Sequence, residues 1–403
     1  MKGPLVNKKI VLGVTGSIAC YKALDLASKL VQKGALVDTI MTESSLEFLT
    51  PLSFKAITNR SVVTNMYDMN SEFSINHVGL AESADIIMVA PATANIIAKI
   101  ANGISDDPLT TTILATKSPV AIAPAMDGNM YDNPATQNNI ATLMSRGIFV
   151  AGPENGRLAS GLVGNGRMTS PENLIDVISM TLGSTGDLAG KKILVSAGGT
   201  IEPLDLVRYI SNRSSGKMGH AIAEAARDRG AIVTLISASN TLPNPIGIRT
   251  GKVKTSSEMY ATISKEINDI DVIIMAAAVS DWTPKEYLDT KQKKNDSDNW
   301  SINLIKTTDI IASISNPKLI KIGFAAESDD LIGNSKTKLT SKSLDFIVAN
   351  DITEVDNGFE SDNNSVSIIH PNGNIESIPT MSKYEIGNEI LDRILPLFDK
   401  YLS

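Results

Sequence analysis

The chain has 403 residues, of which 42% are hydrophobic and 20% are charged. One hydrophobic core rarely supports so long a chain, so we expect two domains of about 200 residues each. The net charge of −7 argues against a general nucleic-acid or anionic-membrane binder. The single cysteine, Cys20, excludes an internal disulfide and a cysteine cluster for zinc, and the three histidines are too far apart to identify a metal site. The sequence shows no signal peptide and no membrane-length apolar run, so we expect a cytoplasmic protein.

Short apolar runs alternate with helical patterns in the first half of the chain. The runs lie at residues 9–15, 35–41, 85–91, 119–125 and 147–152. The stretch 19–34 between the first two has the periodicity of an amphipathic helix, and a further helix is expected after the capping residues 169–172. Continuous apolar strands separated by such helices predict a parallel sheet that is covered on both faces.

The same alternation restarts after a stretch rich in glycine and small polar residues at 183–190, which we interpret as a linker. The second set of runs lies at 192–199, 231–237, 271–279, 319–327 and 345–350, followed by a predicted hairpin at 365–379 and a helix from about 382 to 401. The sequence therefore predicts an α/β protein with two doubly wound parallel-sheet domains, 1–182 and 191–403, the second Rossmann-like with a C-terminal hairpin.

The first glycine turn, GVTGS at 13–17, is not the G-x-G-x-x-G of a dinucleotide site. The second strand also ends in hydroxyl residues, Thr42 and Ser44, where a dehydrogenase needs an acid for the ribose. Hydroxyl groups beside a helix start suit a monophosphate, which favours a mononucleotide such as a flavin phosphate. Each signal alone is also consistent with an ordinary tight turn. His77, on a short amphipathic helix at 76–84, is by its pattern alone more often a structural residue than a catalytic one.

Several motifs in order resemble the flavin-dependent cysteine decarboxylases, and among them phosphopantothenoylcysteine decarboxylase. They are GVTGSIACYK, the histidine before LAESAD, PATAN, PAM-x-x-x-MY and LASGLVGNGRM, and they cover about residues 8–180. The resemblance implies a flavodoxin-like sheet and an active site between the subunits of a trimer. It also implies a catalytic role for His77 and FMN-site roles for Gly16, Ser17, Thr42, Ser44, Thr93, Asn95 and Met126.

Two residues depart from this family pattern. The family usually has asparagine after PAM, where this chain has Asp127, and a proton-donating cysteine in the glycine-rich flap, where this chain has Ser160. A carboxylate at position 127 would repel a substrate carboxylate unless it is protonated or turned toward a donor. Asn129 could supply the missing amide, and Ser160 could relay a proton. We expect both Asp127 and Ser160 to belong to the catalytic site.

A second glycine turn, SSGKMG at 214–219, opens an alanine-rich helix whose backbone N–H groups could bind phosphates. It is not a P-loop, because Ser211 stands at the first glycine and Met218 at the magnesium-binding hydroxyl residue. Polar groups also follow the strands of this half, including the KQKK run at 291–294. A charge run of this kind is usually a solvated surface, although lysines beside strand ends suit a triphosphate.

These residues resemble phosphopantothenate–cysteine ligase over essentially all of 191–403. The motifs are GGT-x-E-P-x-D, VRYISNRSSGKMG, AAAVSDW, KQKK, GFAAE, ANDI and GFESDNN. The resemblance implies that Asn212 steadies an acyl-nucleotide intermediate and that Lys291 binds the nucleotide phosphates. It places further nucleotide contacts at Asp281, Phe324, Lys338 and Lys342.

Together the two halves resemble the bifunctional prokaryotic enzyme of coenzyme A synthesis. The resemblance implies FMN as cofactor, CTP as co-substrate with Mg²⁺, small-molecule substrates, and a homo-oligomer of decarboxylase trimers joined by ligase dimers. Two alternatives are an NAD(P)-dependent reductase, which the glycine spacing disfavours, and a non-catalytic flavoprotein scaffold.

Overall fold

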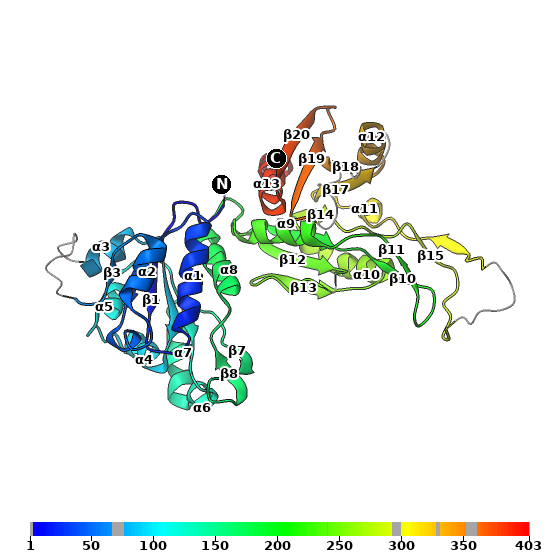
Figure 1. Cartoon of the computed structure of the whole chain (residues 1–403). Helices are drawn as coiled ribbons and strands as arrows, with labels where there is room; N and C mark the ends of the chain where they lie inside the picture. Colours follow the sequence, from blue (N-terminus) through cyan, green and yellow to red (C-terminus); the bar gives the residue numbers. More distant parts are fainter. Residues whose placement is uncertain are drawn as a thin grey trace. The chain divides into compact units, whose positions relative to one another are not determined.

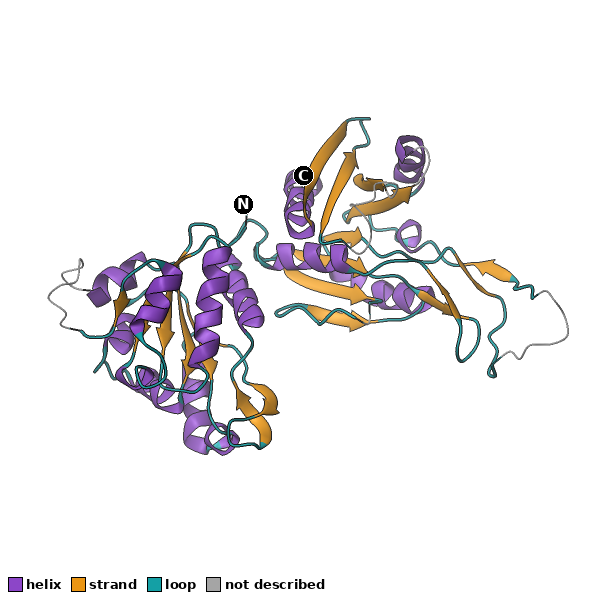
Figure 2. Cartoon of the chain, in the orientation of Figure 1, coloured by secondary structure: helices purple, strands orange, loops and turns teal. Residues whose placement is uncertain are grey.

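The computed structural model describes residues 3–66, 76–239, 241–291, 300–327, 331–351 and 361–402 (Figure 1). The chain divides into two compact units, Met1–Gly183 and Ser184–Ser403. Both units are α/β, with helices packed on parallel strands (Figure 2), so the predicted fold class is confirmed. None of the helices in the described part is long and apolar enough to cross a membrane.

The first unit is built on a sheet of six parallel strands in the order β3-β2-β1-β4-β5-β6. These strands are β1 Lys9–Val14, β2 Leu36–Met41, β3 Val62–Val63, β4 Ile86–Ala92, β5 Val120–Pro124 and β6 Phe149–Val150. The central strands are buried along their length, which explains why they read as continuous apolar runs. Two further strands, β7 Glu154–Arg157 and β8 Val163–Arg167, form a separate antiparallel hairpin that includes the glycine-rich flap expected from the sequence. We call residues 154–167 the flap.

Helices connect these strands and cover the sheet. They are α1 Cys20–Gln32, the 3-10 turn η1 Glu43–Ser45, α2 Pro51–Thr58, α3 Asn76–Ser83, α4 Ala94–Asn102, α5 Pro108–Ala115, α6 Gly128–Asp132, α7 Pro134–Ser145 and α8 Pro171–Gly183. Helix α1 packs on α2 and α8, while α3 packs on α5 and α4 on α7. One cluster of buried side chains from α3, α4, α5 and α7 packs against β1, β2, β4 and β5 to form a core layer.

The second unit has an eight-stranded sheet in the order β13-β12-β9-β14-β17-β18-β19-β20. Its strands are β9 Lys192–Ala197, β12 Ile232–Ser237, β13 Arg249–Lys252, β14 Val272–Met275, β17 Ile320–Glu327, β18 Phe346–Asp351, β19 Asn363–Ile369 and β20 Ile375–Ser382. All pairs are parallel up to β18, and the predicted C-terminal hairpin β19–β20 adds two antiparallel strands.

Two faces of this sheet carry separate hydrophobic clusters. The helices of the unit are α9 Lys217–Arg227, α10 Ser256–Glu266 with the 3-10 turn η2 Ile267–Asp269, α11 Ile310–Ser313, α12 Leu331–Ser341 and α13 Lys383–Leu402. Helices α9 and α13 lie against each other over one cluster, and α10, α11 and α12 contribute to the other. Covering both faces buries the parallel strands, as the sequence predicts.

Two short antiparallel ribbons extend from the second sheet and were not predicted. They are β10 Ile201–Pro203 with β11 Tyr209–Ser211, and β15 Trp282–Pro284 with β16 Leu304–Lys306 (Figure 1). The run expected as one strand at 271–279 is also shorter than predicted, because β14 ends at Met275. The following residues, 276–279, leave the sheet and line a cavity.

Candidate functional sites

The turns after β1, β2 and β4 meet at one edge of the first sheet. A Cβ atom on Gly16 would lie 2.5 Å from the Cβ of Ser44, so only glycine permits this approach. The Thr15 hydroxyl donates to the carbonyl oxygen of Pro91 at 2.7 Å and accepts from the backbone N–H of Thr93 at 3.2 Å. These contacts hold the carboxyl ends of three parallel strands together, where α/β sheets bind ligands.

Polar side chains are gathered along this edge. Ser17 and Thr42 are half-buried, and Ser44 is exposed. Thr93 caps α4 by accepting from the N–H of Ile96, and Asn95 is exposed on the first turn of that helix. Hydroxyl groups beside helix N-termini are suitable donors for a phosphate, so the residues present fit the monophosphate of a flavin mononucleotide.

His77 lies in the first turn of α3 and is half-buried. Its Nδ1 atom is buried and has no hydrogen-bond partner among the described residues. Buried polar atoms are nearly always hydrogen-bonded in proteins, so an unpaired one calls for an explanation. A bound ligand or an adjoining subunit could supply the missing partner, which is consistent with a functional role for His77.

The flap packs on the N-terminus of α6 through Met126 and Gly166. The backbone N–H of Met126 donates to the carbonyl oxygen of Gly166 at 3.0 Å, and a Cβ on Gly166 would lie 2.2 Å from the Met126 oxygen. Asp127 caps α6, with its Oδ1 accepting from the N–H of Asn129 at 3.0 Å. Its Oδ2 accepts from the Ser160 hydroxyl, also at 3.0 Å. The two departures from the family pattern are therefore in direct contact.

The base of the flap is held by a buried lysine. Lys22 of α1 donates from Nζ to the carbonyl oxygen of Met168 at 2.5 Å. Burial lowers the pKa of Lys22, and the nearby charge of Arg167 lowers it further. On the opposite strand, Glu154 accepts from the backbone N–H of Ser170 at 3.0 Å. The flap is thus anchored at its base.

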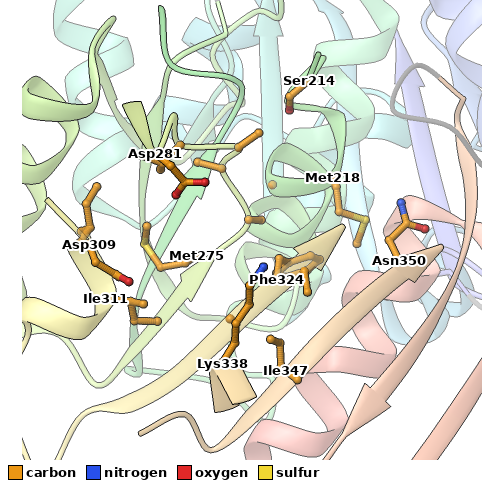
Figure 3. Close-up of a pocket in the computed structure, with 18 of the residues that line it drawn as sticks. Ser214, Met218, Met275, Asp281, Asp309, Ile311, Phe324, Lys338, Ile347 and Asn350 are labelled. Carbon is orange, nitrogen blue, oxygen red and sulfur yellow. The ribbon is translucent and has the colours of Figure 1, made fainter. Parts of the chain in front are cut away.

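The second unit contains a cavity of about 560 Å³ beyond the carboxyl ends of its parallel strands. Four predicted nucleotide-binding residues line it: Asp281, Phe324, Lys338 and Lys342. The glycine turn 214–219 lines it as well. In Figure 3, Lys338 and Phe324 extend into the cavity, with Asp281 and Asp309 on one side and Met218 and Asn350 on the other. The structure thus brings together residues from segments that are far apart in the chain.

Three more lysines line the cavity and were not predicted as site residues: Lys217, Lys306 and Lys383. Lys383, at the start of α13, is only 6% exposed. Burial lowers its pKa, and the nearby charge of Lys217 adds to this effect. Lys217 itself forms an ion pair with Asp362 at 2.7 Å. Grouped ammonium groups in a partly buried cavity are suited to a polyanionic ligand.

Asn350, at the end of β18, was quoted in the ANDI motif but not assigned a role. It lines the cavity and is 9% exposed, and its Oδ1 has no hydrogen-bond partner in the part of the chain that the structure describes. A buried amide oxygen that faces a cavity can accept from a ligand. The apolar run at 345–350 predicts that Asn350 ends a strand, but no sequence pattern indicates the unpaired atom.

Two predicted residues are not among those that line the cavity. The side-chain amide of Asn212 donates to the carbonyl oxygens of Ala278 and Val279 at 3.3 and 3.2 Å, and these two residues do line it. Lys291 is exposed at the end of a described segment, and the other lysines of KQKK lie outside the described residues. No cluster of three or more His, Cys, Asp or Glu side chains suitable for a metal occurs within the described ranges.

The chain is thus a two-domain α/β protein, and each of its doubly wound units has polar groups beyond the carboxyl ends of its parallel strands, where such folds bind their ligands. Residues 1–183 match the family model named Flavoprotein, and residues 188–397 match the DNA/pantothenate metabolism flavoprotein C-terminal domain. The coenzyme A biosynthesis bifunctional protein CoaBC of Vibrio vulnificus (strain YJ016) is 43% identical, covering 98% of this chain and 98% of that protein. CoaBC of Bacillus subtilis (strain 168) is also 43% identical, with the same coverage of both chains.

Among solved structures, the C-terminal domain of a CoaBC protein is 33% identical. It covers 53% of this chain and 99% of that chain, with a TM-score of 0.46. The chain therefore belongs to the family of bifunctional coenzyme A biosynthesis proteins. It is a multifunctional flavoprotein enzyme, and the NAD(P)-dependent reductase considered above does not account for this full-length similarity.

Proposed function

We propose that the chain catalyses two successive steps of coenzyme A biosynthesis, one in each unit. The second unit would join 4′-phosphopantothenate to cysteine with CTP and Mg²⁺, and the first would decarboxylate the product, 4′-phosphopantothenoylcysteine, with FMN. The full-length similarity to CoaBC proteins supports the pair of activities. The observation that carries the ligase assignment is the cavity of about 560 Å³, which combines a glycine turn with five lysines.

The ligation requires activation of a carboxylate, because its carbonyl group is a poor electrophile. CTP would supply this activation by forming an acyl-cytidylate with release of pyrophosphate, and the cysteine amine would then attack the acyl group. The backbone N–H groups of the glycine turn and the surrounding lysines would neutralise the phosphates. Magnesium usually binds through one or two carboxylates plus phosphate oxygens, and Asp281 and Asp309 are available in the cavity wall.

We keep Asn212 and Lys291 as proposed ligase residues, with roles adjusted to their positions. Because Asn212 holds the backbone of Ala278 and Val279, it would fix the loop against which the acyl-nucleotide lies. Lys291, whose side chain is exposed, would bind the nucleotide phosphates. Asp281, Phe324, Lys338 and Lys342 are proposed to contact the nucleotide directly, since all four line the cavity.

In the first unit, FMN would take up two electrons from the cysteinyl thiol and return them after CO₂ has left, so the step has no net redox change. Gly16, Ser17, Thr42 and Ser44 would hold the phosphate of FMN, where the turns after β1 and β2 meet. Thr93, Asn95 and Met126 would line the flavin and substrate pocket. The unpaired, buried Nδ1 of His77 supports a role for this side chain in proton transfer with the substrate.

We also propose a homo-oligomer, with decarboxylase trimers joined by ligase dimers, that works in the cytoplasm, where nucleotides and these metabolites are found. The ribbons of the second unit expose large apolar side chains, among them Leu206, Val207, Tyr209, Trp282 and Ile305. Exposed apolar surface of this extent is typical of interaction sites, and we assign it to a second copy of the ligase unit.

One experiment tests both activities. The purified protein is incubated with 4′-phosphopantothenate, cysteine, CTP and Mg²⁺, and the products are identified by mass spectrometry while pyrophosphate and CO₂ are measured. Formation of 4′-phosphopantetheine with both by-products supports the proposal. Replacing CTP by ATP tests the nucleotide preference. Absence of pyrophosphate would exclude the ligase, and pyrophosphate without CO₂ would exclude the decarboxylase.

A further inference from the structure

Asp127 and Ser160 approach each other from two separate elements. Asp127 precedes α6, and Ser160 lies in the turn between β7 and β8, 33 residues further along the chain. The cap of α6 uses only Oδ1 of Asp127, which accepts from the N–H of Asn129. Oδ2 is therefore left for Ser160, whose hydroxyl donates to it at 3.0 Å. Helix capping alone does not require this second contact.

The environment of the pair is open to proton exchange with solvent. Ser160 is exposed at the tip of the flap, and Asp127 is half-buried. Two glycines flank the pair, because Gly161 follows Ser160 with a φ of +86° and Gly128 follows Asp127. A Cβ on Gly128 would come within 3.2 Å of the carbonyl oxygen of Asn165 in the flap. The backbone is thus shaped to let the flap tip reach the carboxylate.

The decarboxylation has a proton requirement that such a pair can meet. When the C–C bond to the carboxylate breaks, its electrons stay on the carbon that loses CO₂. That carbon must then bind one proton, which ultimately comes from solvent. An alcohol is a weak acid, so Ser160 alone is a poor donor. A carboxylic acid that hydrogen-bonds to the alcohol can protonate its oxygen as the hydroxyl proton is transferred to carbon.

We propose, on the basis of the proposed decarboxylase function, that Asp127 and Ser160 form a two-residue proton relay. In the resting protein the Ser160 hydroxyl donates to the Asp127 carboxylate. Once Asp127 has taken up a proton from solvent, the hydrogen bond reverses, so that Asp127 donates to Ser160 Oγ while Ser160 delivers its own proton to the carbon. Asp127 is thus a positioning residue that resupplies Ser160. Atoms and charge balance in this step: one O–H bond of Ser160 breaks and one C–H bond forms, while the proton of Asp127 replaces the one that Ser160 has lost. The pair thereby takes the role of the proton-donating cysteine that the family pattern has at the position of Ser160.

Asp127→Asn is the sharpest test, because it separates the relay from a purely structural contact. An asparagine can still cap α6 with its amide oxygen, and its amide nitrogen can donate to Ser160 Oγ, but it holds no acidic proton. We expect the rate of 4′-phosphopantetheine formation, relative to the rate of CO₂ release, to fall about 100-fold, as is typical for loss of a general acid. A species two hydrogens lighter than 4′-phosphopantetheine should accumulate instead. Adding Ser160→Cys to this variant should restore the full product, because a thiol supplies its own proton.

One control makes the result interpretable. Hydrogen exchange of residues 158–162, measured on the protein without added FMN, should be unchanged in Asp127→Asn and faster in Ser160→Ala. An unchanged product ratio in Asp127→Asn, or accumulation of the lighter species by the unsubstituted protein, would overturn the relay. If the unsubstituted protein releases no CO₂, the decarboxylase proposal itself fails.

Discussion

Lys342, which directly follows α12, forms an ion pair with Asp309, the N-cap residue of α11, at 2.9 Å in the wall of the ligase cavity. The pair joins two elements that follow different strands of the sheet. Without a ligand, Asp309 balances the charge of Lys342. An incoming phosphate or metal ion must therefore break this ion pair. Nucleotide binding should therefore depend on both members of this contact.

Lys342→Met should weaken binding of CTP about 10- to 100-fold, because a charge-assisted hydrogen bond contributes roughly 1.5–3 kcal/mol. Calorimetric titration of CTP into the protein measures the effect. Lys336→Met is the matched control, since Lys336 is exposed on the preceding helix α12 and does not line the cavity. Equal affinities for the two variants would show that Lys342 does not contact the nucleotide.

Gly16→Ala should weaken FMN binding about tenfold, since overpacking of this kind commonly costs about 1–3 kcal/mol. The new methyl group would lie 2.5 Å from the Cβ of Ser44 and 2.9 Å from its carbonyl oxygen, so the two turns must separate. Quenching of flavin fluorescence on titration measures the affinity. Gly3→Ala serves as control, because the nearest atom to its new methyl group is 3.8 Å away. Unchanged FMN affinity in Gly16→Ala would place the phosphate elsewhere.

Tyr384→Phe should lower the free energy of unfolding of the second unit by about 1–2 kcal/mol. The Tyr384 hydroxyl donates to Asp228 Oδ2 at 2.9 Å, and Arg227 pairs with the other oxygen at 2.8 Å. Burial raises the pKa of Tyr384, and the adjacent Asp228 adds to the shift. Urea unfolding of the full chain should show a loss that the exposed Tyr260→Phe does not reproduce. If Tyr384→Phe and Tyr260→Phe lower the free energy of unfolding equally, then water has replaced the Tyr384 hydroxyl as the partner of Asp228.

Protonation of Glu376 at low pH should lower the free energy of unfolding of the second unit. Arg393 lowers the pKa of Glu376 below its ordinary value of 4.5; burial partly opposes this shift, while His370 adds to it. Because the folded pKa is the lower one, the contribution to stability is present above about pH 4.5 and is lost as pH falls through the folded pKa. Glu376→Gln should reduce this acid-dependent loss by about 0.5–1 kcal/mol, which is typical of a partly exposed pair. A pH dependence in Glu376→Gln equal to that of the unsubstituted protein would contradict the assignment.

Much of the fold could be predicted because its strands are buried on both faces and read as apolar runs. The run at 192–199 marks β9, and Asn372–Gly373 marks the hairpin turn between β19 and β20. The cavity was predicted only in part. Lys306 and Lys383 reach it from β16 and the start of α13, and no local pattern links these segments. The Asp127–Ser160 contact was also hidden, since it depends on how the flap folds back onto α6.

The stretch interpreted as a linker is partly built into the second unit. Leu188 is fully buried in the cluster beneath α9 and α13, its N–H donates to the Arg229 carbonyl oxygen at 3.0 Å, and Asp187 pairs with the Arg229 side chain at 2.6 Å. A ligase fragment that begins at Lys191 would therefore lack part of its own core. Removing a buried leucine commonly costs about 2–5 kcal/mol, so autonomous expression of this half should require a start at or before Ser184.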